Sequence, residues 1–187
     1  MRRSVRRFRR EEISDEDLKY VLNVARHSPS GANRQPWRFI LVRDLEDKRR
    51  IREICEAVEK EFYKHVSDWF LEFTRSRGIN WMKPHLEEAP VLIAIAAYRR
   101  SPHWKESVWI MVGYLILAAQ ERGLATLTYT PSDVRWAREF FNLPEGWGLE
   151  TIIPIGYPAE DPTFPGRYGL DELVFMGRWG VKDTFSK

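Results

Sequence analysis

The assignment of helices and strands starts from the stretch Pro29-Ser30-Gly31-Ala32-Asn33-Arg34-Gln35-Pro36-Trp37. Its two prolines, its glycine and its small residues predict a loop, because proline disfavours helix in the residue before it. Upstream, apolar residues recur at helical spacing over residues 18–25, behind a capping sequence at residues 14–17. Downstream, the apolar residues 37–42 predict a short strand. The loop therefore joins a helix to a strand.

Helices and strands alternate through the rest of the chain. We expect helix at residues 44–74 (one helix, or two with a bend), at residues 108–120 and from Pro131 onward. We expect strands at residues 91–97, 124–130 and 149–155, followed by a tail rich in proline, glycine and aromatic residues. This order, without a repeat or a linker, predicts one α/β or α+β domain in which helices cover a sheet.

The composition excludes several classes of protein. With 187 residues, 43% hydrophobic and 30% charged, the chain suits a single globular domain. One cysteine and four scattered histidines predict neither a disulfide nor a metal site. The longest uncharged apolar run, residues 108–119, is too short to span a bilayer, and acidic residues follow the first arginines where a signal peptide needs an apolar stretch. We therefore expect a cytoplasmic protein that does not contact membranes.

The N-terminal segment, residues 2–10, contains six arginines. Arg2, Arg3 and Arg6 surround the hydroxyl of Ser4, and guanidinium groups with a hydroxyl suit a phosphate monoester. The alternative is a solvated arm or a tail that binds nucleic acid without sequence preference. Because acidic residues follow at once and the net charge is only +3, we expect no nucleic-acid partner.

Two further segments offer groups to a flat ligand. The small residues Ser30, Gly31 and Ala32 would let backbone N–H groups approach it, although a plain connecting loop is the alternative. The alternation of Thr126, Thr128 and Thr130 places three hydroxyls on one face of a strand. The alternative there is the preference of threonine for strands.

A third set of residues carries charge. Glu59 and Tyr63 share one face of the long helix, and Lys83 lies in the sequence Asn-Trp-Met-Lys-Pro of residues 80–84. A solvated helix edge and a surface lysine are the alternatives. Since there is no catalytic triad and no glycine-rich nucleotide loop, we expect a cofactor to supply the chemistry.

Taken together, these segments resemble the nitroreductase-like flavoprotein superfamily along nearly the whole chain. The matching motifs are Arg-Arg-Ser-x-Arg at residues 2–6, the loop at 29–37, Gly-Leu-x-Thr at 123–126, Pro-x-Gly-Tyr-Pro at 154–158, and Arg167. The resemblance implies an FMN cofactor and an α+β fold with a central mixed sheet covered by helices. It also implies an intertwined homodimer in which both chains build each FMN site, with residues 1–187 as one domain.

The resemblance further assigns cofactor-binding residues. Arg2, Arg3, Ser4, Arg6 and Arg167 would hold the FMN phosphate. Pro29, Ser30 and Gly31 would lie along the ribityl chain and the isoalloxazine ring, and Thr128, Tyr129 and Thr130 would face the ring from the other side. The Thr130 hydroxyl would bond flavin N5.

Within the superfamily the chain is similar to the iodotyrosine deiodinase subgroup, because Glu59, Tyr63 and the Asn-Trp-x-Lys sequence ending at Lys83 match its substrate clamp. This implies reductive dehalogenation of halotyrosines, with Ala32 N–H at the phenolate oxygen and a lid at about residues 59–90. The rival interpretation is an NAD(P)H-dependent nitroreductase or flavin reductase acting on nitroaromatics or quinones. The electron donor stays open between NAD(P)H, a reductase and a ferredoxin.

Overall fold

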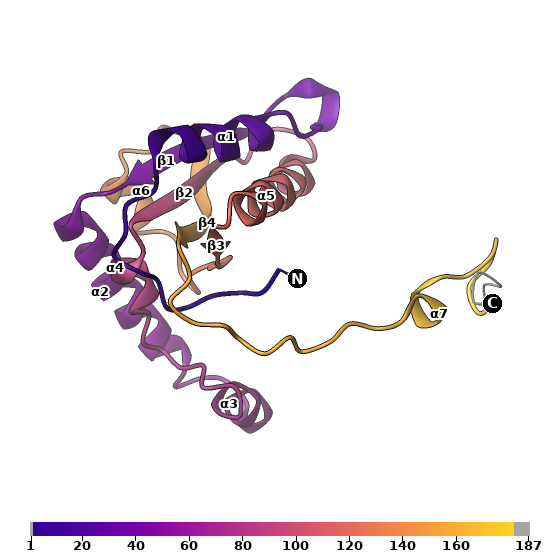
Figure 1. Ribbon diagram of the computed structural model, residues 1–187. Coiled ribbons are helices and arrows are strands. Elements are labelled where there is room, and N and C mark those ends of the chain that lie inside the picture. Colours follow the sequence, from indigo (N-terminus) through magenta and orange to yellow (C-terminus); the bar gives the residue numbers. More distant parts are fainter. Residues whose placement is uncertain (1, 182–187) are drawn as a thin grey trace.

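A four-stranded sheet forms the centre of the computed structural model, which describes residues 2–181 (Figure 1). Its strands lie in the order β1-β2-β4-β3 and are β1 (Trp37–Val42), β2 (Val91–Tyr98), β3 (Ala125–Thr126) and β4 (Trp147–Gly156). All three strand pairs are antiparallel. Among the described residues, the one parallel pairing is the isolated bridge from Ser4 to Thr126.

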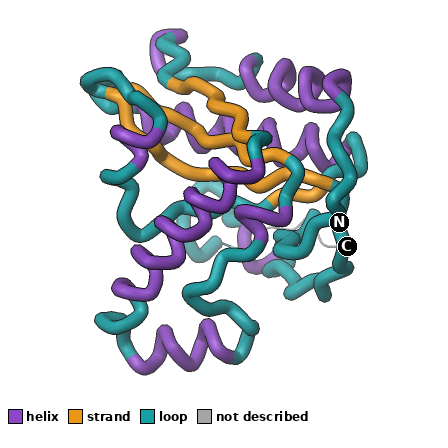
Figure 2. Tube along the Cα trace, turned by 90° about the vertical axis from the view of Figure 1, so that its left-hand side faces the viewer, coloured by secondary structure: helices purple, strands orange, loops and turns teal. Residues whose placement is uncertain are grey.

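Helices cover both faces of this sheet (Figure 2). They are α1 (Asp15–Arg26), α2 (Leu45–Phe62), α3 (Asp68–Arg75), α4 (His85–Glu88), α5 (Trp104–Glu121), α6 (Ala137–Phe140) and α7 (Leu170–Leu173). Because strand side chains alternate, Ile93 of β2 packs with α1 and α5, whereas Leu92 packs with α2 and α4. The expected α+β fold with helices covering a central sheet is thus confirmed, but the sheet is antiparallel in its three strand pairs and not mixed as expected.

The expected helix at residues 44–74 is two helices. α2 ends before Tyr63, and α3 begins after Ser67, whose hydroxyl accepts a hydrogen bond from the Phe70 N–H at 3.4 Å. Ser67 therefore acts as a new N-cap that separates the two helices. The rings of Phe62, Tyr63 and Phe70 contact one another edge to face across the break.

Two expected boundaries are wrong. The strand predicted at residues 124–130 is reduced to β3 and an isolated bridge at Tyr129, because Pro154 on the facing strand β4 has no N–H to donate. The helix predicted from Pro131 begins only at Ala137. In the residues before Ala137, the Ser132 backbone N–H donates to the Glu59 side chain and takes no part in a helix.

The C-terminal tail leaves the body of the molecule after β4 and carries α7 (Figure 1). Its large apolar side chains are exposed, namely Tyr168, Leu170, Leu173, Met176 and Trp179. The single domain is expected to span residues 1–187. Residues 1 and 182–187 of this range lie outside the described part of the chain. No helix within residues 2–181 has the length and apolar character needed to cross a membrane.

The helix α4 buries a histidine. His85 is 4% exposed, its ring meets the Tyr129 ring edge to face at 5.8 Å, and its Nε2 has no hydrogen-bond partner in the described part of the chain. Burial lowers the pKa of His85 to about 3, and the positive charges of Lys83 and Arg6 act in the same direction. His85 is therefore neutral in the folded protein near pH 7.

His85 should make stability depend on pH. Its pKa is about 3 when folded and about 6.5 when unfolded, so the unfolded state binds the extra proton between these values. Folding stability should fall as the pH drops below about 6.5, by up to about 1.4 kcal/mol per pH unit. Urea titrations of wild type and His85→Gln between pH 7 and 5 measure this slope.

The variant should lose that part of the slope, whereas His27→Gln, at an exposed histidine, should keep it. Equal slopes in wild type and His85→Gln would contradict the buried, neutral state of His85.

Candidate active site

A cavity of about 770 Å³ lies between the N-terminal arm, the segment that follows α3, and residues 127–129. Four of the predicted site residues line it: Arg6, Lys83, Thr128 and Tyr129. Side chains of both charges, such as Glu56 and Arg52, stand beside aromatic ones such as Trp81. A concave site with a few polar groups is what a small-molecule site requires.

Glu59 is buried next to this cavity, at 7% exposure. The Tyr129 hydroxyl donates to Glu59 Oε1 at 3.0 Å, and the Ser132 N–H donates to the same oxygen at 3.0 Å. The alternative interpretation of Glu59, as part of a solvated helix edge, is therefore wrong. Tyr63, one turn further along, is half-buried, and this burial raises its pKa.

Lys83 reaches the same place from the segment after α3. It is 7% exposed, and its Nζ donates to the Asn80 carbonyl at 2.5 Å. Nζ lies 5.9 Å from the centre of the Tyr63 ring and 5.8 Å from that of Tyr129. Burial lowers the pKa of Lys83, and the Glu59 charge opposes that effect. The structure thus brings Glu59, Tyr63 and Lys83 together, and the surface-lysine alternative is wrong.

Two residues that the sequence analysis missed hold the lysine segment in place. Glu56 Oε1 accepts the Lys83 backbone N–H at 2.8 Å, and Glu56 Oε2 pairs with Arg52 at 2.7 Å. Arg52 also pairs with Glu87 of α4 at 2.7 Å. The i, i+4 spacing of Arg52 and Glu56 was visible in the sequence, but their contact with Lys83 was not.

The threonines and Tyr129 occupy opposite faces of their segment. Thr128 and Thr130 are exposed, whereas the Tyr129 side chain is 8% exposed and points to Glu59. Thr126 lies at the alternate position shared with the other threonines, but it is buried. Its backbone bridges to Ser4 of the arm. A contact of Thr128, Thr130 or the Tyr129 backbone with a flavin stays a prediction.

The N-terminal arm is tied to the start of the tail. Arg3 donates to the Pro162 carbonyl at 2.7 Å and pairs with Asp161, and the Arg6 backbone N–H donates to Glu160 at 2.5 Å. Arg2 and Ser4 belong to the same arm. Arg167 lies further along the tail, with its guanidinium 5.3 Å from the centre of the Phe164 ring.

The loop at residues 29–37 lies elsewhere. Gly31 N–H donates to the Ser107 hydroxyl of α5 at 3.1 Å, and Ala32 has a left-handed φ of 49°. Figure 1 shows this loop at the opposite end of the molecule from α3. Within one chain, the structure does not place Pro29, Ser30, Gly31 or Ala32 against the Glu59–Lys83 cluster.

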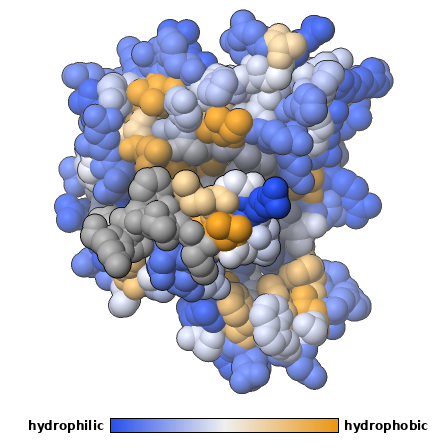
Figure 3. Space-filling view, turned by 90° about the vertical axis from the view of Figure 1, so that its right-hand side faces the viewer, coloured by the Kyte–Doolittle hydropathy of each residue, from blue (hydrophilic) through white to orange (hydrophobic). Residues whose placement is uncertain are grey.

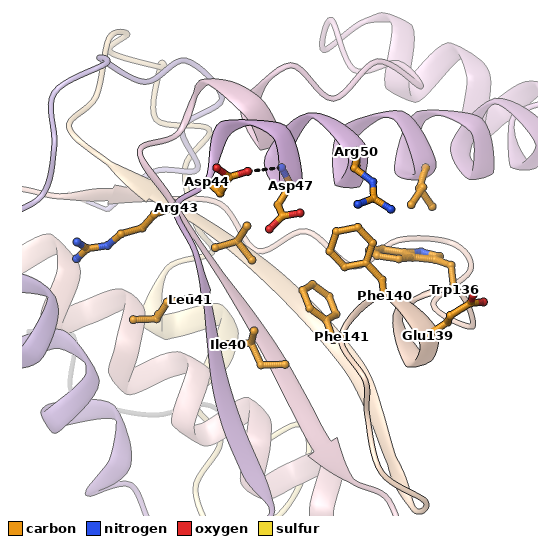
Figure 4. Close-up of a pocket in the computed structure, with 12 residues that line it drawn as sticks. Ile40, Leu41, Arg43, Asp44, Asp47, Arg50, Trp136, Glu139, Phe140 and Phe141 are labelled. Atoms are coloured by element: carbon orange, nitrogen blue, oxygen red, sulfur yellow. Dashed lines mark hydrogen bonds between the residues drawn. The ribbon is translucent and has the colours of Figure 1, made fainter.

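A second cavity, of about 640 Å³, lies between β1, α2 and α6 (Figure 4). Trp136, Phe140 and Phe141 form its aromatic side, and Asp47 and Arg50 face them from α2. None of the predicted site residues lines it. Within residues 2–181, no cluster of three or more His, Cys, Asp or Glu side chains could hold a metal ion.

Comparison with known proteins shows the family of the chain. A family model described as the nitroreductase family matches residues 1–157. An iodotyrosine deiodinase of Thermotoga neapolitana is 45% identical, covering 92% of this chain and 91% of its own length. One of Haliscomenobacter hydrossis is 36% identical, covering 94% and 84%.

A solved structure is similar over nearly the whole chain. It is a crystal structure of oxidised iodotyrosine deiodinase bound to FMN and 3-iodo-L-tyrosine, with a TM-score of 0.87 and 41% identity. The match covers 96% of this chain and 95% of that one. The chain belongs to the nitroreductase family, in its iodotyrosine deiodinase subgroup.

Proposed function

We propose that this protein binds FMN and catalyses the reductive deiodination of iodotyrosine to tyrosine and iodide. The observation that carries the proposal is that Glu59 and Lys83, from two segments, both lie against the buried Tyr129, with the Tyr63 ring beside Lys83. A buried carboxylate and a buried ammonium are costly, and a nitroreductase of broad specificity has no use for them. A buried carboxylate and a buried ammonium group together suit a zwitterionic ligand, which carries one charge of each sign.

The clamp leaves the right groups free for an amino acid. Both hydrogen bonds to Glu59 reach Oε1, so Oε2 faces no protein donor among the described hydrogen bonds and can accept from a substrate ammonium. Lys83 uses one of its three donors on Asn80 and can pair with the substrate carboxylate through the others. These charge-assisted bonds strengthen as the cavity excludes water.

The residues beside the cavity also fit FMN. The cavity of about 770 Å³ has Arg6 at one side and the Thr128 segment at another. Arg2, Arg3, Ser4, Arg6 and Arg167 would hold the phosphate, and Thr128, the backbone of Tyr129 and Thr130 would face the ring. When bound, FMN supplies the electrons for the reaction. Dehalogenation consumes two electrons and one proton, as the carbon–iodine bond breaks, a carbon–hydrogen bond forms and iodide leaves.

The complete site requires a second chain. The loop carrying Pro29, Ser30, Gly31 and Ala32 lies far from the clamp of its own chain, although the resemblance implies that both would lie around one flavin. Large apolar side chains are exposed on the tail and on α5. On α5 they are Trp109, Ile110, Tyr114 and Leu117. Apolar side chains lie among charged ones on the face that carries the tail (Figure 3). A homodimer would cover this surface and complete the site.

In the dimer, the Ala32 N–H would donate to the phenolate oxygen of the substrate. A backbone donor fixed there holds oxygen charge while the neighbouring ring carbon takes a proton. The physiological donor stays open between NAD(P)H, a reductase and a ferredoxin. A cytoplasmic location also stays a prediction.

The main prediction concerns turnover. Purified protein loaded with FMN should release equal amounts of tyrosine and iodide from 3-iodotyrosine under anaerobic conditions with dithionite as reductant. Chromatography of tyrosine and an iodide-selective electrode measure the two products. A flavin-loaded protein that releases no iodide, but oxidises NADPH rapidly with nitroaromatics, would assign it to the nitroreductase interpretation.

A second prediction tests the clamp. Lys83→Ala should weaken 3-iodotyrosine binding about 10- to 100-fold, because a hydrogen bond to a charged group is worth about 1.5–3 kcal/mol. Titration of flavin fluorescence measures the affinity. The affinity for 2-iodophenol, which lacks the zwitterion, should be unchanged in the same variant.

The clamp should also respond to pH. Because burial lowers the pKa of Lys83, wild-type affinity should fall at a pH below the usual range of lysine, as the ammonium loses its proton. Lys83→Arg keeps its charge, so the part of the alkaline fall that is due to Lys83 should disappear, leaving only the part due to the substrate's own ammonium group. An identical alkaline profile in both proteins would contradict the role of Lys83.

A further inference from the structure

Tyr129 is the residue on which the clamp converges, although the sequence placed it with the flavin-facing group. Its hydroxyl donates to Glu59 Oε1 at 3.0 Å, and Lys83 Nζ lies 5.8 Å from its ring centre. The ring packs edge to face on His85, and Tyr129 shares a core cluster with the buried Cys55. One side chain therefore contacts the residues of both halves of the clamp.

The backbone of Tyr129 is rigidly held. It exchanges two hydrogen bonds with Ile152 of β4, at 3.0 and 2.8 Å, and its carbonyl also accepts from the Thr151 hydroxyl at 3.0 Å. Thr151 and Ile152 are fully buried. The backbone of Tyr129 is thus fixed to the central sheet, whereas Glu59 comes from α2 and Lys83 from the segment after α3.

The electrostatic surroundings keep this hydroxyl protonated. Burial raises the pKa of Tyr129, and the nearby Cys55 and Glu59 raise it further. Burial also raises the pKa of the Cys55 thiol to about 12. Tyr129 is therefore a permanent donor to Glu59 throughout the range in which the enzyme would work.

We propose that Tyr129 is a positioning residue: its hydroxyl fixes Glu59 Oε1 so that Oε2 is presented to the ammonium group of the substrate. The inference rests on the proposed function and adds a residue to it. Ser132 N–H donates to the same oxygen from the other side, so two donors set the orientation of the carboxylate. Thr128 and Thr130 flank Tyr129, so the same segment would link the clamp to the flavin.

The alternative is that Tyr129 is merely a large core residue. Tyr129→Phe separates the two roles, because it keeps the ring and removes only the donor. Without the donor, Glu59 can rotate and its affinity for an ammonium falls. A matched control is Tyr20→Phe, since Tyr20 makes a similar bond to Glu121 at 2.7 Å on the surface of the molecule.

The experiment titrates FMN-loaded wild type, Tyr129→Phe and Tyr20→Phe with 3-iodotyrosine and with 2-iodophenol, following flavin fluorescence. We expect Tyr129→Phe to bind 3-iodotyrosine at least fivefold more weakly, with FMN content and 2-iodophenol affinity unchanged. Tyr20→Phe should match wild type with both ligands. In the Glu59→Gln background, adding Tyr129→Phe should cost little more, because the hydroxyl acts through Glu59.

Four results would overturn the inference. If Tyr129→Phe binds 3-iodotyrosine as tightly as wild type does, the hydroxyl does not orient Glu59. An equal loss for both ligands means a structural role in the core. Additive losses in the Glu59→Gln background mean that Tyr129 acts independently. If wild type itself fails to bind 3-iodotyrosine, the proposed function falls first and the inference falls with it.

Discussion

The hydrogen bond from Tyr129 to Glu59 is the constraint around which the site is arranged. It places a carboxylate at 7% exposure beside the core cluster of Cys55, Leu86 and Ile152. A buried charge is tolerated only where donors and a counter-charge compensate for its lost hydration. The bonds from Tyr129 and Ser132 supply the donors, and Lys83 supplies the counter-charge. The hydrogen bond from the Lys83 backbone to Glu56 holds the segment after α3 against α2 and so keeps this lysine beside Glu59.

Rigid elements hold the two halves of the clamp. Glu59 comes from α2, which packs on the sheet, and Glu56 of the same helix holds the Lys83 backbone. A clamp built in this way is largely formed before a substrate arrives, which reduces the entropy lost on binding. The flavin side is different, because its predicted residues are divided between the arm, the tail and a distant loop. That division is the physical reason for proposing a second chain.

The sequence predicted the layered α+β fold, because β2 is apolar on both faces and the helices around it are amphipathic or apolar. It also found Glu59, Tyr63 and Lys83, through spacing and resemblance. It could not predict that Tyr129 turns toward Glu59, since alternation shows that Tyr129 opposes the threonines but not what lies on that face. It missed Glu56 for the same reason: its bond to Lys83 spans 27 residues. The shortened β3 depends on Pro154 in a strand that only the folded sheet places opposite.

In the proposed dimer, each site takes its clamp from one chain and its loop from the other. Co-expression of a Lys83→Ala chain with a Gly31→Val chain, each with a different affinity tag, gives a mixed dimer that two purification steps isolate. Each homodimer should release little iodide from 3-iodotyrosine. The mixed dimer should recover about half of the wild-type rate, because one of its sites contains no substitution. A mixed dimer as inactive as its parents would contradict a site shared between chains.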